Sequence, residues 1–561
     1  MRGDASRYWP ERLVPTMDVP QTSLSFNLAT TAQRFPDRPA CIADGVVLTY
    51  RDLALQVERL AAHLRLHCGV APGDRVLLFT QNSPQFVIAY YAILRVDAIV
   101  VPVNPMNKTG ELEHYASDSG ACGVIATRDV WPHAEPLVQR GLLCWAVLGC
   151  YDDVLSLGAS APNQSGFSSK TSITDWVDAV RHDNVAPPSR ALPSDLALMV
   201  YTSGTTGVPK GCLHTHQSIA SGILNSVCWH GLNHTGVVLA TVPMFHVTGM
   251  QTNMNVPIYL GATVVILRRW NAAAAVQLIR QHDVTEWTAI STMITDVLSL
   301  PDLPPHALSS LRYLRGGGAP MPEAVARRFD ESFGIRYLEG YGLSETIAAV
   351  LFNPPSNPKR QCAGIPMVNV DARVVEPQGT AELAIGQVGE IIVSGDQVFS
   401  GYWKQPAADT DAFIQIDGRR FLRTGDLGYI DEDGYFHVVD RIKRMINASG
   451  FKVWPNEVEN MLYRHPAVQE ACVIASHDPH RGETVKAVIV LRREHRDSVT
   501  KDDLIHWARG EMAAYKVPRL IEFRDALPRS SSGKVLWREL QDQELSATAL
   551  SGARQRRHET P

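Results

Sequence analysis

The alternation of helical and strand-like segments over residues 20–150 constrains the fold more than any other feature of this chain. Residues 49–66 carry apolar side chains at helical spacing, and the run RVLLF that follows reads as a short apolar strand. The longest apolar run, residues 86–103, is interrupted by Arg95 and Asp97, which indicates a buried helix and strand and not a membrane span. Alternating strands and helices predict an α/β architecture of layers with parallel strands.

The chain length predicts several domains. With 561 residues the chain is too long for a single core, and roughly three to four domains or subdomains are expected. A second alternating stretch covers 195–350, and short strands and turns dominate 365–440. We therefore predict a large N-terminal domain, 1–442, of two α/β subdomains and a small β subdomain, then a small α+β domain, 443–546, and a disordered tail, 547–561.

The charge and the cysteines limit the partners and the compartment. A net charge of -5 argues against a general nucleic-acid binder, so an anionic substrate has to be met by local cations. The nine cysteines are scattered without a CxxC pair, which fits a reducing compartment. The first residues do not resemble a signal peptide and the last match no lipidation or peroxisomal signal, so we expect a cytoplasmic protein. Peripheral contact with a membrane and a homodimer stay open.

One loop offers the groups that a phosphate needs. The stretch YTSGTTGVPKG, Tyr201–Gly211, combines closely spaced backbone N–H groups, hydroxyl groups and one cation, Lys210. It is not a Walker loop, because Pro209 separates Gly207 from the lysine. Since LALMVY before it and GCLHTH after it are strand-like, we expect the loop to join two strands and to move over a triphosphate. By composition alone, a flexible polar turn is an equal alternative.

Six further motifs accompany this loop, and their order along the chain is more specific than any one of them. Together with the loop, they resemble the adenylate-forming superfamily, which contains acyl-CoA synthetases, luciferases and the adenylation domains of peptide synthetases. The resemblance implies a large AMP-binding domain followed by a small, mobile AMP-binding C-terminal domain. The motifs are PMFHVTG (243–249), RGGGAP (315–320), GYGLSET (340–346), RTGDLGY (423–429), DRIKRMINASGFKVWPNEVE (440–459) and PRSSSGK (528–534).

The resemblance implies a nucleotide site. Hydroxyl and N–H groups of the loop would bind the β- and γ-phosphates of ATP, and Ser344 would contact the α-phosphate. Glycines would line the adenine plane, where backbone approaches a flat ring closely, and Tyr341 would stack on the base. Asp426 would accept the ribose hydroxyl groups, with a simple turn residue as the alternative, and Arg441 would donate to ribose and phosphate. The implied ATP- and AMP-binding residues are Thr202, Ser203, Gly204, Thr205, Thr206, Lys210, Gly317, Gly318, Ala319, Gly340, Tyr341, Gly342, Ser344, Asp426 and Arg441.

The resemblance also implies three catalytic residues, Lys534, Glu345 and His246. The Lys534 ammonium on the mobile domain would orient the substrate carboxylate against the α-phosphate and stabilise charge during the transfer. Glu345, directly after the GYG turn, would be a ligand of Mg²⁺, with a solvated carboxylate as the alternative. His246 would border the carboxylate pocket, with a buried core histidine as the alternative. Lys443 would be the hinge between the domains, and Gly450 would leave a tunnel for the thiol of CoA.

Two residues near the hinge depart from the common pattern of the family. Arg444 stands where many members have an acidic residue, and Asp440 replaces a frequent glycine. Neither residue touches the implied chemistry. The resemblance therefore does not say how Arg444 packs beside the hinge.

The motifs imply an ATP-dependent acyl-CoA synthetase, an AMP-forming acid–thiol ligase with ATP, CoA and a carboxylic acid as substrates. The acid would first join AMP with release of pyrophosphate, and the CoA thiol would attack the acyl-adenylate after the small domain rotates. The stretches WPERLVPTMDVPQTSL, YGLSETIAAVLFNP and INASGFKVWPNEVE look most like bacterial medium- and long-chain fatty acyl-CoA synthetases. An aryl- or branched-acid CoA ligase is the alternative, followed by a luciferase-like enzyme. An amino-acid adenylation domain is disfavoured, because PMFHVTGMQTN offers no aspartate for an α-amino group.

Overall fold

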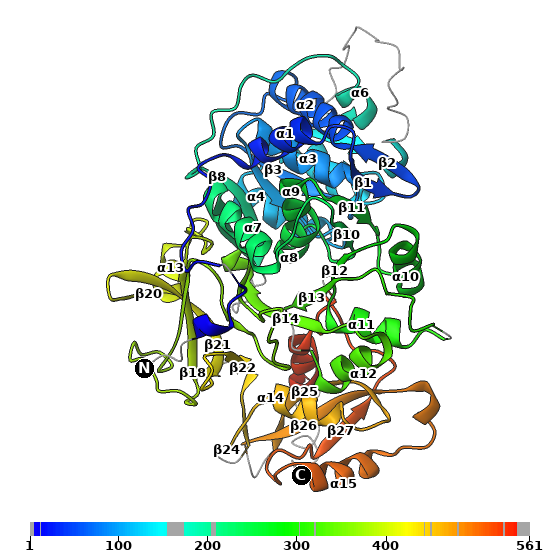
Figure 1. Ribbon diagram of the computed structural model, residues 1–561, viewed down its shortest axis with the longest axis vertical. Coiled ribbons are helices and arrows are strands. Elements are labelled where there is room, and N and C mark those ends of the chain that lie inside the picture. Colours follow the sequence, from blue (N-terminus) through cyan, green and yellow to red (C-terminus); the bar gives the residue numbers. More distant parts are fainter. Residues whose placement is uncertain are drawn as a thin grey trace, which may run out of the picture.

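The computed structural model contains four sheets among the residues that it describes, with helices packed against them (Figure 1). The predicted tail and the predicted domain boundary at residues 442 and 443 lie outside these residues. None of the helices in the described ranges combines the length and the apolar character that crossing a membrane needs. The described residues are 5–11, 13–153, 173–202, 209–301, 303–318, 321–441, 444–448, 451–478, 482–530 and 533–546.

An eight-stranded sheet forms the first layer, and most of its strands are parallel, as the alternating pattern predicts. Its strand order is β19-β9-β8-β4-β3-β5-β6-β7. β8 runs parallel to β4, and β9 folds back antiparallel on β8, so the prediction that the polar loop joins two strands is confirmed. The strands are β3 (Arg75–Phe79), β4 (Ile99–Pro102), β5 (Gly123–Thr127), β6 (Trp145–Gly149), β7 (Ile173–Asp175), β8 (Leu196–Thr202), β9 (Lys210–Thr215) and β19 (Gly401–Tyr402).

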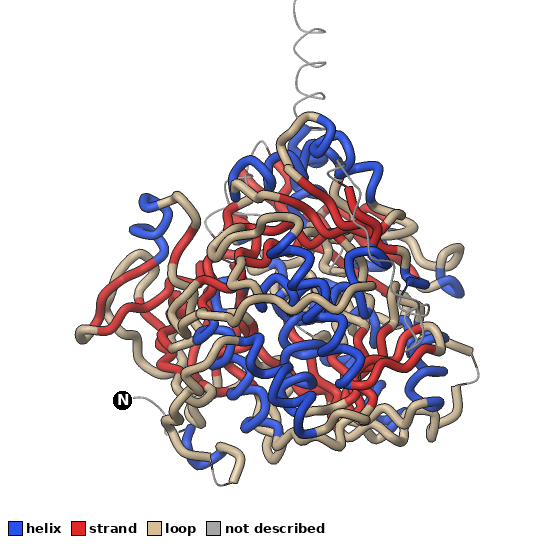
Figure 2. The backbone as a smooth tube through the Cα atoms, turned by 90° about the horizontal axis from the view of Figure 1, so that it is seen from above, coloured by secondary structure: helices blue, strands red, loops and turns tan. Residues whose placement is uncertain are grey.

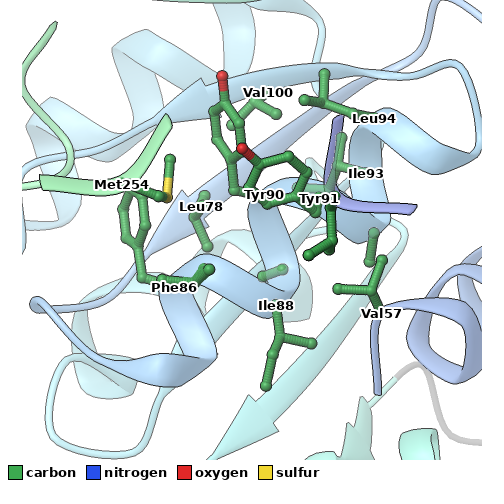
Figure 3. Packing of buried hydrophobic residues seen from close by; sticks show 14 of the residues in the cluster. Val57, Leu78, Phe86, Ile88, Tyr90, Tyr91, Ile93, Leu94, Val100 and Met254 are labelled. Atoms are coloured by element: carbon green, nitrogen blue, oxygen red, sulfur yellow. The ribbon is translucent and has the colours of Figure 1, made fainter. Parts of the chain in front are cut away.

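The helices beside this sheet begin at capping residues and bury apolar faces. α2 begins after Thr49, whose hydroxyl accepts from the Asp52 N–H at 3.2 Å while the Asp52 carboxylate accepts from the Thr49 N–H at 3.1 Å. α3 follows the N-cap Ser83 and is buried from Pro84 to Leu94, and Figure 3 shows its side chains in the core. The predicted buried helix and strand in 86–103 are thus confirmed as α3 and β4. The helices are α1 (Leu24–Arg34), α2 (Tyr50–Leu66), α3 (Pro84–Arg95), α4 (Thr109–Ser119), α5 (Trp131–Gln139), α6 (Trp176–Val180) and α7 (His216–His230).

A nine-stranded sheet forms the second layer, in the order β16-β15-β14-β13-β12-β10-β11-β1-β2. Strands β11, β10, β12, β13 and β14 pair in parallel, and β15 folds back antiparallel on β14. Seen from above, helices fill the middle of the molecule with strands to either side (Figure 2). The strands are β1 (Pro39–Ala43), β2 (Val46–Thr49), β10 (Val237–Ala240), β11 (Thr263–Ile266), β12 (Glu286–Thr288), β13 (Tyr313–Gly317), β14 (Tyr337–Leu343), β15 (Ala348–Phe352) and β16 (Ile365–Pro366). The helices are α8 (Val247–Met250), a π-helix (Gln251–Asn255), α9 (Val256–Leu260), α10 (Ala272–Gln281), α11 (Ser291–Leu298) and α12 (Glu323–Phe333).

A small antiparallel sheet follows, in agreement with the β subdomain predicted over 365–440. Its order is β17-β18-β21-β20, and β22 pairs with β21. The RTGDLGY motif lies inside the long strand β21, so Asp426 is a strand residue and the turn alternative is wrong. The elements are β17 (Val370–Val375), β18 (Gly389–Gly395), α13 (Pro406–Ala412), β20 (Phe413–Ile416), β21 (Arg419–Ile430) and β22 (Phe436–Arg441).

The C-terminal sheet has the order β24-β23-β26-β25, with β27 parallel to β26. The predicted capping box at α15 is confirmed: the Thr500 hydroxyl accepts from the Asp503 N–H at 3.2 Å, and the Asp503 carboxylate accepts from the Thr500 N–H at 2.9 Å. A last helix, 537–546, packs Leu540 against Val488 of this sheet. The elements are β23 (Ile446–Ala448), β24 (Phe451–Val453), α14 (Pro455–Leu462), β25 (Val468–Asp478), β26 (Gly482–Leu491), α15 (Lys501–Glu511) and β27 (Leu520–Phe523).

Candidate active site

A tight turn between β14 and β15 presents Glu345. The GYG residues form part of β14 and pair with β15, so the turn expected at these glycines lies instead at Ser344–Thr346, a single 3-10 turn. Ile347, which follows, is fully buried and has a φ of 52°, a conformation that β-branched residues rarely adopt. Such a residue costs about 1–3 kcal/mol and persists only where surrounding contacts determine its conformation.

Buried amide and hydroxyl side chains supply contacts that determine this turn. The Thr346 hydroxyl accepts from the Leu343 N–H at 2.8 Å. The Gln397 amide donates to the Ala349 carbonyl at 2.7 Å, and the Asn225 amide donates to Gln397 Oε1 at 2.8 Å. Because these polar side chains are buried and hydrogen-bonded, the turn is held from α7, from the loop after β18 and from within.

Three more groups hold Ser344 and Glu345, the first two residues of the turn. His214 Nε2 lies 2.7 Å from the Ser344 carbonyl oxygen, so the imidazole carries a proton on Nε2 and donates it. Burial lowers the pKa of His214 to about 4, which keeps the ring neutral at pH 7. The Phe399 N–H donates to the Glu345 carbonyl, and the Tyr402 hydroxyl donates to Glu345 Oε1, each at 2.8 Å. The Glu345 carboxylate is therefore oriented by the protein.

The Asp426 carboxylate has a partner on each oxygen. Its residue is only 3% exposed, the Tyr341 hydroxyl donates to Oδ2 at 2.6 Å, and Arg441 Nε lies 3.0 Å from Oδ1. Burial and the adjacent Asp426 carboxylate raise the pKa of Tyr341, so its hydroxyl stays protonated and donates. Since a carboxylate oxygen accepts more than one hydrogen bond, ribose hydroxyl groups fit beside these partners.

Lys534, in the loop between β27 and the last helix, reaches Gly318, which directly follows β13 in the second layer. A Cβ atom built on Gly318 would lie 3.0 Å from Lys534 Cε and 3.3 Å from Nζ, so the lysine passes directly over this glycine. Gly318 has a φ of +84°, and a larger residue would be strained there and would also press on the lysine. The neighbouring Gly533 is seated against Ile290, because a Cβ atom at 533 would lie 2.3 Å from Ile290 Cδ1.

The charged groups of the site act on one another. Burial and the positive charge of Arg441 lower the pKa of Lys534, while the carboxylates of Asp426 and Glu345 oppose this shift. Burial and the charge of Lys534 lower the pKa of His246 to about 3, so the imidazole is neutral at pH 7. The structure thus brings five predicted residues that are far apart in sequence into one site: His246, Glu345, Asp426, Arg441 and Lys534.

Glycines in two motifs let β14 approach its neighbours closely, β13 on one side and β15 on the other. A Cβ atom on Gly317 would lie 2.3 Å from the Gly340 carbonyl oxygen, and one on Gly340 would lie 2.3 Å from the Phe352 ring. Packing between strands is therefore sufficient to require glycine at both positions. Their contact with adenine, like that of Gly342, stays a prediction.

The β8–β9 hairpin brings Lys210 to the same region. Thr202 and Lys210 are partners across the two strands, and Lys210 Nζ lies 5.3 Å from the centre of the Tyr402 ring. β19, which carries Tyr402, pairs with β9. Several predicted site residues lie outside the described part of the chain: Ser203, Gly204, Thr205, Thr206, Ala319, Lys443 and Gly450.

The two departures from the family pattern lie side by side. Asp440 is 1% exposed, and its Oδ2 accepts from the Asn456 N–H at 3.0 Å, in the first turn of α14. Arg444 Nη2 donates to Glu459 Oε1 at 2.6 Å and to the Val473 carbonyl at 3.1 Å. Arg444 Nη1 lies 3.9 Å from Asp440 Oδ1. Arginine at 444 is therefore explained by the buried carboxylates on either side of it.

Sequence reasoning missed three side chains that hold the Glu345 turn: His214, Gln397 and Tyr402. His214 is a polar residue inside the apolar strand GCLHT, and such a residue usually signals a buried hydrogen bond. Gln397 and Tyr402 carry no comparable signal. Nothing in the sequence connects Tyr402 with Glu345, which lies 57 residues earlier.

Comparison with known proteins agrees with this geometry. The model of the family described as "AMP-binding enzyme" matches residues 28–403, and that of the "AMP-binding enzyme C-terminal domain" matches residues 457–534. The chain therefore belongs to the AMP-binding enzyme family, among its adenylate-forming acyl-CoA ligases. The predicted superfamily and the predicted class, AMP-forming acid–thiol ligase, are confirmed.

Similar proteins include ligases for different acids. The long-chain-fatty-acid–CoA ligase of Bacillus subtilis (strain 168) is 34% identical over 552 residues, which are 96% of this chain and 97% of that protein. The feruloyl-CoA synthase of an Amycolatopsis species is 34% identical over 507 residues, 90% of this chain and 96% of that protein. The crystal structure of the anthranilate CoA ligase AuaEII with anthranoyl-AMP has a TM-score of 0.83 at 25% identity, and the match covers 97% of this chain and 100% of that one.

Proposed function

We propose that the protein converts a medium- or long-chain fatty acid into its CoA thioester, with ATP and CoA as the other substrates. The position of Lys534 supports the ATP-dependent activation step: this lysine passes over Gly318, and the charges of Arg441, Asp426 and Glu345 act on it. An ammonium delivered there by the C-terminal domain can hold a carboxylate against the α-phosphate of ATP and stabilise the charge that develops.

The two half-reactions follow from these groups. In the first, a carboxylate oxygen of the acid attacks the α-phosphorus, the bond to the bridging oxygen breaks, and pyrophosphate leaves with the electron pair. Lys534 orients the attacking carboxylate, and Asp426 with Arg441 positions the ribose. In the second, the CoA sulfur attacks the acyl carbon, AMP leaves, and the thiol gives up its proton. We assign the hinge for this step to Lys443 and the path of the thiol to Gly450.

A magnesium ion fits the residues of the site. Glu345 Oε1 accepts from Tyr402, which leaves Oε2 as a hard oxygen ligand of the kind that Mg²⁺ prefers. In the described ranges, no group of three or more His, Cys, Asp or Glu side chains is arranged to hold a metal ion. Phosphate oxygens and water would therefore supply the remaining ligands of an ion held by Glu345. When bound, Mg²⁺ would neutralise part of the charge of the triphosphate.

The acid is inferred from the relatives. The Bacillus subtilis ligase is named for long-chain fatty acids, which supports a fatty acid, whereas the feruloyl-CoA synthase and the anthranilate ligase make an aromatic acid the second candidate. The test is AMP release by the full chain with ATP, CoA and Mg²⁺, screened across fatty, branched and aromatic acids. Medium- and long-chain fatty acids should give the highest kcat/KM. A higher kcat/KM for an aromatic or branched acid would show that the fatty-acid assignment is wrong. If no acid supports AMP release, the proposed ligase activity is wrong.

We further propose a cytoplasmic location. All nine cysteines are free, as expected in a reducing compartment. Two further properties can be tested: whether the protein binds a membrane surface, and whether it forms a homodimer. Flotation with phospholipid vesicles and multi-angle light scattering would decide them.

A further inference from the structure

The Tyr402 side chain lies between Glu345, which the proposed function assigns to Mg²⁺, and Lys210, which the family resemblance assigns to ATP. Its hydroxyl donates to Glu345 Oε1 at 2.8 Å, and Lys210 Nζ lies 5.3 Å from the centre of its ring. The ring packs edge-on against Phe399, with ring centres 4.8 Å apart. One half-buried side chain thus contacts both the carboxylate and the cation of the site.

The backbone around Tyr402 is fixed from several directions. The Tyr402 N–H donates to Asp409 Oδ1 at 2.7 Å, and β19 pairs Tyr402 with Cys212 on β9. The Phe399 N–H donates to the Glu345 carbonyl at 2.8 Å, so the segment 399–402 holds Glu345 through its backbone and through its side chain. The hydroxyl therefore meets the carboxylate at a defined point.

We propose that Tyr402 is a positioning residue that fixes the orientation of Glu345 for metal-bound ATP and keeps it apart from Lys210. This proposal rests on the proposed function, because it takes Glu345 as the metal ligand. The Lys210 ammonium and the Glu345 carboxylate carry opposite charges and attract each other. An ion pair between them would occupy both the metal ligand and the cation that is to bind phosphate. Among the described residues Lys210 and Glu345 form no such pair, and the Tyr402 side chain lies against each of them.

Two substitutions separate the two contacts. Tyr402→Phe keeps the ring beside Lys210 and removes only the hydroxyl on Glu345. Tyr402→Leu removes both contacts. The probes are Mn²⁺, read by electron paramagnetic resonance, and α,β-methylene-ATP, which binds without turnover.

The Phe variant should weaken Mn²⁺ binding to the complex with the ATP analogue about tenfold, the size expected for one hydrogen bond to a charged group. Its affinity for the analogue without metal should stay unchanged, and the Leu variant should lose that affinity as well. In pyrophosphate exchange, the Mg²⁺ concentration for half-maximal rate should rise while the KM for the acid stays constant. A generally damaged site would change both quantities.

A matched control and a double variant complete the test. Tyr151→Phe also removes a tyrosine hydroxyl next to a carboxylate, that of Asp129 at 3.2 Å. Tyr151 follows β6, which β5, β3, β4 and β8 separate from β9 in the sheet, so this substitution should leave Mn²⁺ binding unchanged. In a Glu345→Ala background, Tyr402→Phe should cause no further loss, because the hydroxyl acts through the carboxylate.

The variants test two roles separately: that of Glu345 as metal ligand and that of Tyr402 as positioning residue. If Glu345→Ala leaves Mn²⁺ binding unchanged, the metal assignment in the proposed function is wrong. If Glu345→Ala weakens it but Tyr402→Phe behaves like Tyr151→Phe, the metal assignment stands and the positioning role is overturned. Additive losses in the double variant would also overturn the positioning role.

Discussion

Replacing Arg444 by methionine should destabilise the C-terminal domain by about 3–5 kcal/mol, the usual cost of removing one partner from a buried ion pair. The Arg444 side chain is 11% exposed, that of Glu459 14% and that of Asp440 1%, so water screens these charges little. The substitution removes the 2.6 Å hydrogen bond to Glu459 and the 3.1 Å hydrogen bond to the Val473 carbonyl. It also leaves two carboxylates buried without their cation.

The pH dependence of this loss has a definite sign. Burial raises the pKa of Asp440 above its ordinary value of 3.8, and Arg444 opposes that rise. Without the guanidinium the pKa of Asp440 should rise further. A carboxyl with a raised pKa in the folded state stabilises the fold most at low pH, and this contribution is lost as the pH rises through the folded pKa. The deficit of Arg444→Met relative to the unsubstituted protein should therefore grow from pH 4 to pH 8.

Hydrogen exchange of β25 amides in the full chain is the suitable assay, because a multidomain protein need not unfold in two states. A loss of about 3 kcal/mol corresponds to exchange faster by roughly a hundredfold or more. The control is Arg464→Met, since the pair Arg464–Glu323 is 3.9 Å apart with side chains 51% and 40% exposed, and such pairs contribute about 0–1 kcal/mol. Equal, small effects of both substitutions would refute the buried network.

Two further predictions concern the half-reactions. Gly318→Ala should lower pyrophosphate exchange by about tenfold or more, because its Cβ would lie 3.0 Å from Lys534 Cε. The control Gly334→Ala has a similar φ of +67° but no atom within 4 Å of its Cβ, and it should leave exchange unchanged. Equal losses in both variants would mean that backbone strain alone lowers the rate. Lys443→Pro and Gly450→Leu should keep exchange and lose acyl-CoA formation, since proline fixes φ near about −65° and leucine narrows the thiol path. Loss of exchange to the same extent, in protein shown to be folded by circular dichroism, would contradict rotation about 443.

Local features of the fold could be predicted because they depend on neighbouring residues. The helix after Thr49 and the helix after Thr500 follow from side chains that hydrogen-bond within three residues. The β8–β9 hairpin follows from two apolar runs around a polar loop. The nucleotide-site residues could be named only through the order of the motifs, since Asp426 and Lys534 are unremarkable in their own segments.

Contacts between distant segments could not be predicted. β19 contains two residues, too few for a periodic pattern, yet its pairing with β9 decides that Tyr402 meets Glu345. The positive φ of Ile347 contradicts the preference of a β-branched residue and is imposed by buried partners from other elements. Asp440 and Arg444 each depart from the family pattern, but the sequence does not show that they lie together. The charge of Arg444 is also balanced by Glu459, which accepts from Arg444 and from the Val473 N–H of β25.

The most direct test of the account compares the two half-reactions in Lys534→Ala. Carboxylate-dependent exchange of pyrophosphate into ATP reports on adenylation, and thioester formation from a supplied acyl-adenylate reports on the second step. Exchange should fall by about a hundredfold or more, because a charge aimed at a transition state contributes about 3 kcal/mol. Thioester formation should be largely retained, since Lys534 acts only where the carboxylate meets the α-phosphate. An equal loss in both half-reactions would contradict the account.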